Sequence, residues 1–114
     1  MHVINQTRNT VLISQVRMAD TFLLRLRGLL GSQPLNQGEG LILVGEKSIH
    51  TFFMGFSIDV VYLNKKYEVI LTQEDMVPYR LGPLVFNSAF VLEMPVGTIA
   101  QTNTKVGDQL KFES

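Results

Sequence analysis

The sequence contains no cysteine. This absence excludes disulfide bonds, thiol nucleophiles and thiolate metal sites. The sequence also has no excess of positive or negative charge, because ten basic and ten acidic residues give a formal net charge of zero. The basic residues are scattered and form no stripe, so we expect no binding to nucleic acid.

Long hydrophobic runs are missing too. No window approaches the roughly 18 apolar residues that a membrane-spanning helix needs. The N-terminus shows no basic stretch followed by an apolar one, which is the pattern of a signal peptide. We therefore expect a cytoplasmic protein that does not associate with a membrane.

The chain does have enough apolar material for one core. Of its 114 residues, 46% are hydrophobic and 18% are charged, which is typical of a globular protein. This length suits one domain and is short for two. We predict a single domain over residues 1–114.

Short apolar segments separated by turn residues predict a mostly β structure. Asn64-Lys65-Lys66 predicts a hairpin turn, and Pro95-Val96-Gly97-Thr98 predicts the end of a strand and a single helical turn. Residues 74–86 contain prolines and Gly82 and predict an irregular segment. Strands are predicted at residues 2–5, 11–16, 41–44, 48–54, 58–63, 67–71, 90–94 and 109–112.

One helix, longer than the single turn predicted at residues 95–98, is predicted after Asp20, which is a typical N-cap residue. Phe22 and Leu26 begin an apolar series at helical spacing, and Gly28 or Gly31 could end the helix. The predicted fold is a compact sandwich or barrel-like sheet with one short helix in the N-terminal half of the chain.

Polar residues inside the apolar segment 49–63 mark the best place for a site. Burying an unpaired polar group costs roughly 1–3 kcal/mol, so such residues need partners in the fold or in a ligand. His50 and Thr51 are adjacent and should point to opposite faces of a regular strand, unless Gly55 introduces a bulge. Asp59 lies in a strand that is apolar on both faces, and Glu93 lies in a second such strand.

Two interpretations of these carboxylates remain open. With His50, they could perform acid–base chemistry, because burial raises a carboxyl pKa, or they could offer one nitrogen and two oxygens to a metal. Alternatively, they accept structural hydrogen bonds; for Asp59 the expected donors are Thr51, Arg80 or backbone N–H groups. One histidine without cysteine is a poor zinc site, so we expect no tightly bound metal and no cofactor.

The chain resembles the uncharacterised bacterial and archaeal family called domain of unknown function 192. The long motif at residues 49–63 carries most of the resemblance, which extends from about residue 11 to residue 112. The resemblance implies a compact, mostly β domain with one early helix, and it implies no established activity. The other matching motifs are Arg25-Leu26-Arg27-Gly28-Leu29-Leu30, Gly40-Leu41-Ile42-Leu43, Val91-Leu92-Glu93-Met94-Pro95-Val96-Gly97 and Gly107-Asp108.

Three functions are compatible with the sequence. The first is a small non-catalytic ligand-binding or accessory module, whose partner would be a small molecule or a protein. The second is a hydrolase-like or metal-dependent enzyme that uses His50, Asp59 and Glu93. The third is a structural domain whose polar motif stabilises the fold. Asp108 is a further position to test, and the candidate binding residues are His50, Thr51, Met54, Asp59, Arg80 and Glu93.

Overall fold

The computed structural model describes residues 1–17, 35–49, 55–78 and 80–114. These residues form eight strands and one short helix, arranged as two sheets. Within the described part, no helix is long and apolar enough to cross a membrane. The elements are β1 (His2–Asn5), β2 (Thr10–Ile13), β3 (Gln15–Arg17), β4 (Glu39–Val44), β5 (Ile58–Leu63), β6 (Val69–Met76), β7 (Phe90–Pro95), α2 (Thr98–Thr102) and β8 (Leu110–Glu113).

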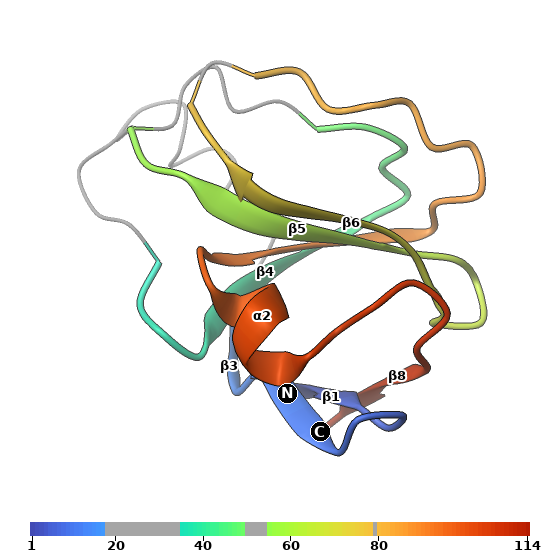
Figure 1. Cartoon of the computed structure of the whole chain (residues 1–114). Helices are drawn as coiled ribbons and strands as arrows, with labels where there is room; N and C mark the ends of the chain where they lie inside the picture. Colours follow the sequence, from blue (N-terminus) through green and yellow to red (C-terminus); the bar gives the residue numbers. More distant parts are fainter. Residues whose placement is uncertain (18–34, 50–54, 79) are drawn as a thin grey trace.

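The two sheets differ in size and lie one above the other. The small sheet has the order β2-β1-β8, and the large sheet has the order β3-β4-β7-β5-β6. All pairings are antiparallel except that of β3 with β4. Figure 1 shows the small sheet and α2 below the large sheet, with segments 45–49 and 80–88 above it. The large sheet is therefore the middle layer.

Both faces of the large sheet are buried at its centre. The lower face, which carries Val61, Leu63, Leu92 and Met94, packs against Val3, Leu12, Ile13 and Leu110 of the small sheet. The upper face carries Ile58, Val60, Tyr62 and Val91, which pack with Leu35, Ile49 and Met76. Strand β5 is accordingly buried along its whole length. This explains why its sequence is apolar on both faces, apart from Asp59.

The predicted hairpin turn between β5 and β6 is confirmed. The side-chain oxygen of Asn64 accepts hydrogen bonds from the backbone N–H groups of Lys66 (2.9 Å) and Glu68 (3.0 Å). Tyr67 donates its N–H to the Asn64 carbonyl at 3.0 Å and adopts a positive φ of 62°. An asparagine side chain that replaces backbone acceptors is a common way to stabilise such a turn.

Two strand predictions need correction. The segment 11–16 is not one strand, because the N–H groups of Ser14 and Gln15 both donate to the Gly38 carbonyl, and the chain passes there from the small sheet to the large one. The segment from Glu74 is not irregular at its start, since β6 continues to Met76. β6 is an edge strand, and edge strands carry polar residues that resemble a loop in sequence.

The helix prediction also changes. The helix in the described residues is α2, near the C-terminal end, where a single helical turn was predicted. It begins after Gly97, whose φ of 98° is easily reached only by glycine. The longer helix predicted after Asp20 falls in residues 18–34, outside the described residues. The predicted strand at 48–54 is not found at Ser48 and Ile49, and its remaining residues also fall outside.

Candidate functional site

Asp59 lies on the lower face of the large sheet and is fully buried. Its Oδ1 accepts a hydrogen bond from the Asp75 N–H at 2.9 Å. Its Oδ2 accepts from the N–H groups of Gly97 (3.1 Å) and Ile99 (2.9 Å). The prediction that Asp59 is buried and bonded to backbone N–H groups is confirmed.

These bonds make Asp59 the cap of helix α2. The N-cap residue Gly97 has no side chain to satisfy the free N–H groups of the first turn. A carboxylate from β5 takes this place, as an N-cap side chain would, and its charge suits a helix N-terminus. Asp59 on β5 therefore connects β6 and α2 through backbone hydrogen bonds, which is a structural role.

Glu93 lies on the opposite, upper face of the same sheet. It pairs across β7 and β5 with Val60, whereas Asp59 pairs with Met94, so the two carboxylates point in opposite directions. Glu93 is 2% exposed, and its Oε1 has no hydrogen-bond partner among the described residues. Glu93 therefore differs from Asp59, whose two carboxylate oxygens both accept hydrogen bonds.

Two more buried polar atoms without a partner in the described part lie on this upper face. They are the hydroxyl of Tyr62 and the side-chain oxygen of Gln73. Val60 pairs with Glu93 on one side and with Gln73 on the other, so both side chains flank it in one cross-strand row. Tyr62 lies two residues along β5, on the same face. We call Tyr62, Gln73 and Glu93 the upper-face polar group.

The upper-face polar group is shielded from water. Burial raises the pKa of Glu93 from 4.5 to about 7. Burial, together with the nearby charge of Glu93, raises the pKa of the Tyr62 hydroxyl to about 12. Segment 80–88 covers Tyr62: a Cβ added to Gly82 would lie 2.9 Å from the hydroxyl oxygen, and the Gly82 N–H donates to the Ile49 carbonyl. Glycine at this position allows the covering segment to approach closely.

The structure separates the residues predicted as one constellation. Asp59 and Glu93 lie on opposite faces of the sheet and cannot contact the same small ligand. Arg80 is exposed and is not among the hydrogen-bond donors to Asp59. His50, Thr51 and Met54 lie outside the described residues, and their roles stay predictions.

No three histidine, cysteine or carboxylate side chains gather among the described residues in a way that could hold a metal ion. We predict that protein purified without added metal contains far less than one equivalent, because a single carboxylate with an amide and a phenol is a weak ligand set. Elemental analysis of the purified protein measures this directly. A stoichiometric metal that survives dialysis would contradict the prediction.

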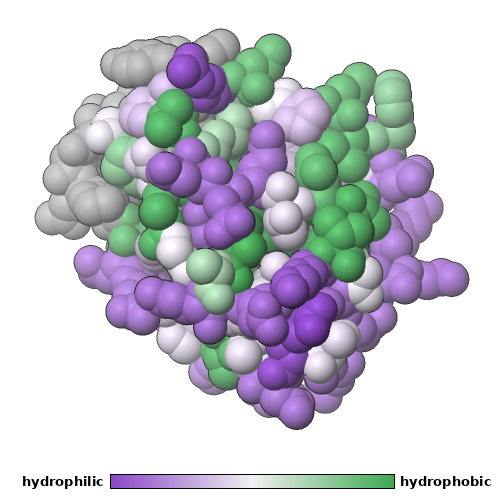
Figure 2. All heavy atoms as spheres, in the orientation of Figure 1, coloured by the Kyte–Doolittle hydropathy of each residue, from purple (hydrophilic) through white to green (hydrophobic). Residues whose placement is uncertain are grey.

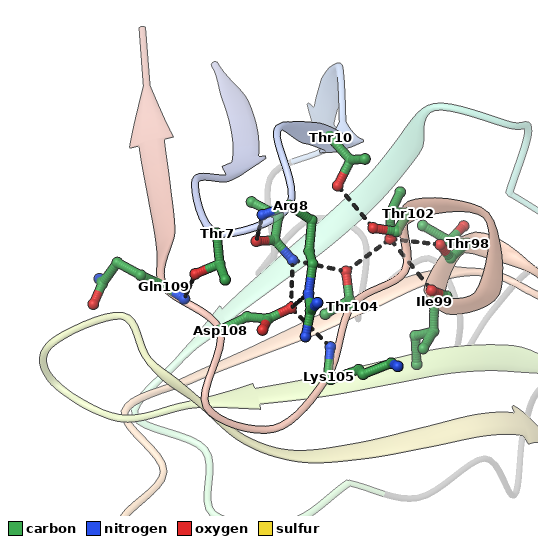
Figure 3. Close-up of polar contacts among 11 residues, drawn as sticks. Thr7, Arg8, Thr10, Thr98, Ile99, Thr102, Thr104, Lys105, Asp108 and Gln109 are labelled. Atoms are coloured by element: carbon green, nitrogen blue, oxygen red, sulfur yellow. Dashed lines mark hydrogen bonds and ion pairs between the residues drawn. The ribbon is translucent and has the colours of Figure 1, made fainter.

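A second buried polar cluster lies at one end of the small sheet (Figure 3). The Oδ2 of Asp108 accepts hydrogen bonds from the Asn5 side chain (2.9 Å), from Nε of Arg8 (3.1 Å) and from the Lys105 N–H (2.9 Å). The Asn5 side chain also donates to Thr104, and its oxygen accepts from the Arg8 N–H. The cluster ties the turn after β1 to the chain before β8, so its role is structural.

The sequence pointed to Asp108 but not to Asn5. Asn5 is fully buried, and 103 positions separate it from Asp108 along the chain. Only the pairing of β1 with β8 brings them together. The one indication in the sequence is that Asn5 is a polar residue at the end of an apolar strand, and this is weak evidence for a buried side chain. Gln73 was missed for the same reason, since its cross-strand neighbour Val60 depends on strand register.

We predict that Asp108→Asn lowers the free energy of unfolding by about 1–3 kcal/mol, because it removes the charge from a buried acceptor of three hydrogen bonds. Burial alone would raise the Asp108 pKa, but hydrogen bonds from Arg8, Asn5 and the Lys105 N–H, and the Arg8 charge, hold it below 3.8. The stabilisation is therefore present above the pKa of the unfolded state and is lost as the pH falls through the lower folded pKa.

Urea denaturation at pH 7 and at acidic pH checks this prediction. Glu113→Gln is the control, because Glu113 makes an exposed ion pair with Lys111 and should change stability by less than about 1 kcal/mol. An Asp108→Asn midpoint equal to that of the control would show that the cluster contributes nothing.

Comparison with known proteins places the chain among uncharacterised relatives. The family model DUF192, described as "Uncharacterized ACR, COG1430", matches residues 3–112. A UPF0127 protein of Thermococcus sibiricus is 36% identical, over 97% of this chain and 74% of that protein. The UPF0127 protein PH1112 of Pyrococcus horikoshii is 27% identical, over 96% of this chain and 97% of that protein.

A solved structure has the same fold. It is a protein of unknown function from Novosphingobium aromaticivorans, with a TM-score of 0.75 at 19% identity, over 97% of this chain and 82% of the other. At this identity the likeness concerns the arrangement of the chain alone.

Proposed function

The chain belongs to the DUF192 family, and we propose that it is a small non-catalytic module that binds a small molecule at the upper face of the large sheet. The observation that carries the proposal is the upper-face polar group, three buried polar atoms on one face without partners in the described residues. Buried polar groups are normally satisfied, and those that are not often belong to ligand sites. The cytoplasmic location stays a prediction from the sequence.

The chemistry of these atoms indicates the kind of ligand. The Gln73 oxygen accepts hydrogen bonds only, an ionised Glu93 accepts only, and the Tyr62 hydroxyl does both. A ligand that offers N–H or O–H donors on an apolar body would satisfy them and would contact the apolar residues around them, which include Val60 and Val91. His50, Thr51, Met54 and Arg80 remain candidate contacts of such a ligand, on the basis of sequence. Asp59 is the least available of the candidate residues for a ligand, because both of its carboxylate oxygens already accept backbone hydrogen bonds.

A protein partner is the alternative occupant, and it would need a donor-rich segment. A catalytic alternative rests on one observation, the pKa of Glu93 near 7, which suits a general acid or base. It would have to operate without Asp59, because that carboxylate faces the other side of the sheet.

Ligand screening tests the proposal. A library of small amines, amides and alcohols is added to ¹⁵N-labelled protein, and amide shifts and melting temperature are recorded, since a ligand of the native state raises apparent stability. We expect shifts centred on β5, β6 and β7. Binding should be lost in Glu93→Gln and retained in Glu74→Gln, whose carboxylate is exposed.

The outcomes separate the alternatives. Shifts that cluster away from Tyr62, Gln73 and Glu93, or binding that Glu93→Gln leaves intact, would contradict the proposed site. Turnover of a bound compound that vanishes in Glu93→Gln would replace the binding module with an enzyme.

A further inference from the structure

An open hollow lies at the hairpin end of the large sheet, apart from the upper-face polar group. Its volume is about 460 Å³, within the roughly 300–1,000 Å³ typical of small-molecule sites. The hairpin turn between β5 and β6 forms one wall, and the segment before β7 forms the other. The lining residues are Lys47, Asn64, Lys65, Lys66, Glu68, Ile70, Phe86, Asn87, Ser88 and Ala89.

The charge of this hollow is unusual for the chain. Three lysines, Lys47, Lys65 and Lys66, are among its lining residues against one acidic residue, Glu68, whereas the whole protein has a net charge of zero. Glu46 precedes Lys47 but does not line the hollow. None of the three lysines makes an ion pair with a described residue. Like charges that gather around a hollow attract an ion of the opposite sign.

The walls are held by hydrogen bonds. Nζ of Lys47 donates to the carbonyls of Phe86 (2.9 Å) and Ser88 (3.3 Å), which fixes this ammonium group against the segment before β7. The Ser88 hydroxyl donates to the Glu46 carbonyl at 2.8 Å. On the other side, the bonds to Asn64 described above hold the turn that presents Lys65 and Lys66. The Lys47 ammonium group and the turn backbone that carries Lys65 and Lys66 are thus held before a ligand arrives, whereas the side chains of Lys65 and Lys66 are exposed.

The hollow also has an apolar part. Phe86 is 74% exposed, an unusual state for a phenylalanine, and Ile70 lies in the same lining. Figure 2 shows hydrophobic surface over segment 80–88 close to hydrophilic surface at the hairpin end. An aromatic ring beside ammonium groups suits a ligand with an anionic head and an apolar or aromatic body.

We propose that this hollow binds a small organic anion, a carboxylate or phosphate ester whose apolar body contacts Phe86 and Ile70. The anionic head is held by Lys47, Lys65 and Lys66, with the Asn64 and Asn87 amides as further polar contacts. The site is independent of the upper-face polar group.

Titration of the ¹⁵N-labelled protein with phenyl phosphate tests the proposal, with inorganic phosphate and benzyl alcohol as partial probes. We expect amide shifts confined to residues 46–48, 64–70 and 86–89, and binding weaker by about tenfold for each partial probe. The double variant K65Q/K66Q should weaken phenyl phosphate binding by about tenfold, as should 0.5 M salt, because both reduce the attraction of the cations. K105Q/K111Q, the control on the small-sheet side, should bind like the parent protein.

Phe86→Ala separates the apolar contact from the charges. It should weaken phenyl phosphate binding and leave inorganic phosphate unchanged. Glu93→Gln should leave both unchanged, so failure at the upper face and failure here are told apart. Equal affinity for phosphate and phenyl phosphate, scattered shifts, or equal losses in the two lysine variants would overturn the proposal.

Discussion

Asp59→Asn is expected to lower the free energy of unfolding by about 1–3 kcal/mol, although it changes only one atom of a side chain. Both carboxylate oxygens accept backbone N–H groups, one from Asp75 and two from Gly97 and Ile99. The asparagine NH₂ must face at least one of these donors, so a donor meets a donor in a buried site. Asp59→Ala should cost more, because it leaves all three N–H groups without an acceptor.

Urea denaturation at pH 7 measures this effect. Asp75→Asn is the matched control: Asp75 is exposed, and its positive φ of 52° is one that asparagine also tolerates. The control should change stability by less than about 0.5 kcal/mol. If Asp59→Asn unfolds at the same urea concentration as the control, Asp59 is not the cap of α2 that the geometry indicates.

Glu93→Gln is expected to act in the opposite direction, stabilising the protein at high pH. The folded pKa of Glu93 is raised from 4.5 to about 7, so below pH 4.5 both folded and unfolded states carry the proton. As the pH rises from 4.5, the unfolded state ionises first, and the benefit of the neutral carboxyl is lost as the pH passes through 7. At about 1.4 kcal/mol per pH unit, this loss is on the order of 3 kcal/mol.

The measurement is the stability difference between Glu93→Gln and the parent protein at pH 4.5 and pH 8. Other titrating groups cancel in this difference, and glutamine imitates the neutral acid. The difference should shift in favour of the variant by a few kcal/mol between the two pH values. Glu74→Gln, which removes an exposed carboxylate from the same sheet, is the control variant. A difference independent of pH would mean that Glu93 ionises in the folded protein as freely as in water.

Sequence reasoning located the strands of the large sheet well where burial fixes the pattern. Residues 58–63 were predicted as a strand and form β5, because a segment that is apolar on both faces, with Asp59 as its one charged residue, has few alternatives in a compact fold. The edge strand β6 was cut short, because its second half pairs on one side only and is polar. The split at Ser14 escaped prediction because it depends on Gly38, which is distant in sequence.

The site shows the same limit. The apolar sequences of their strands predict that Asp59 and Glu93 are buried. Their positions within the two strands do not tell whether the side chains lie on the same face of the sheet. Only the register of β5 against β7 shows that they face opposite sides of the sheet. The donors to Asp59 come from residues up to 40 positions away, and no local pattern identifies them. Non-local pairing therefore decides which polar residues can act together.

Glu93 is a buried carboxyl on the upper face whose Oε1 has no partner among the described residues, and both the pH effect and the proposed binding site depend on it. The most direct test is a pH titration of the Glu93 side-chain ¹³C carboxyl signal by NMR, assigned with the Glu93→Gln variant. We expect a midpoint at about 7. A midpoint near 4.5, the value of a glutamate in water, would contradict it.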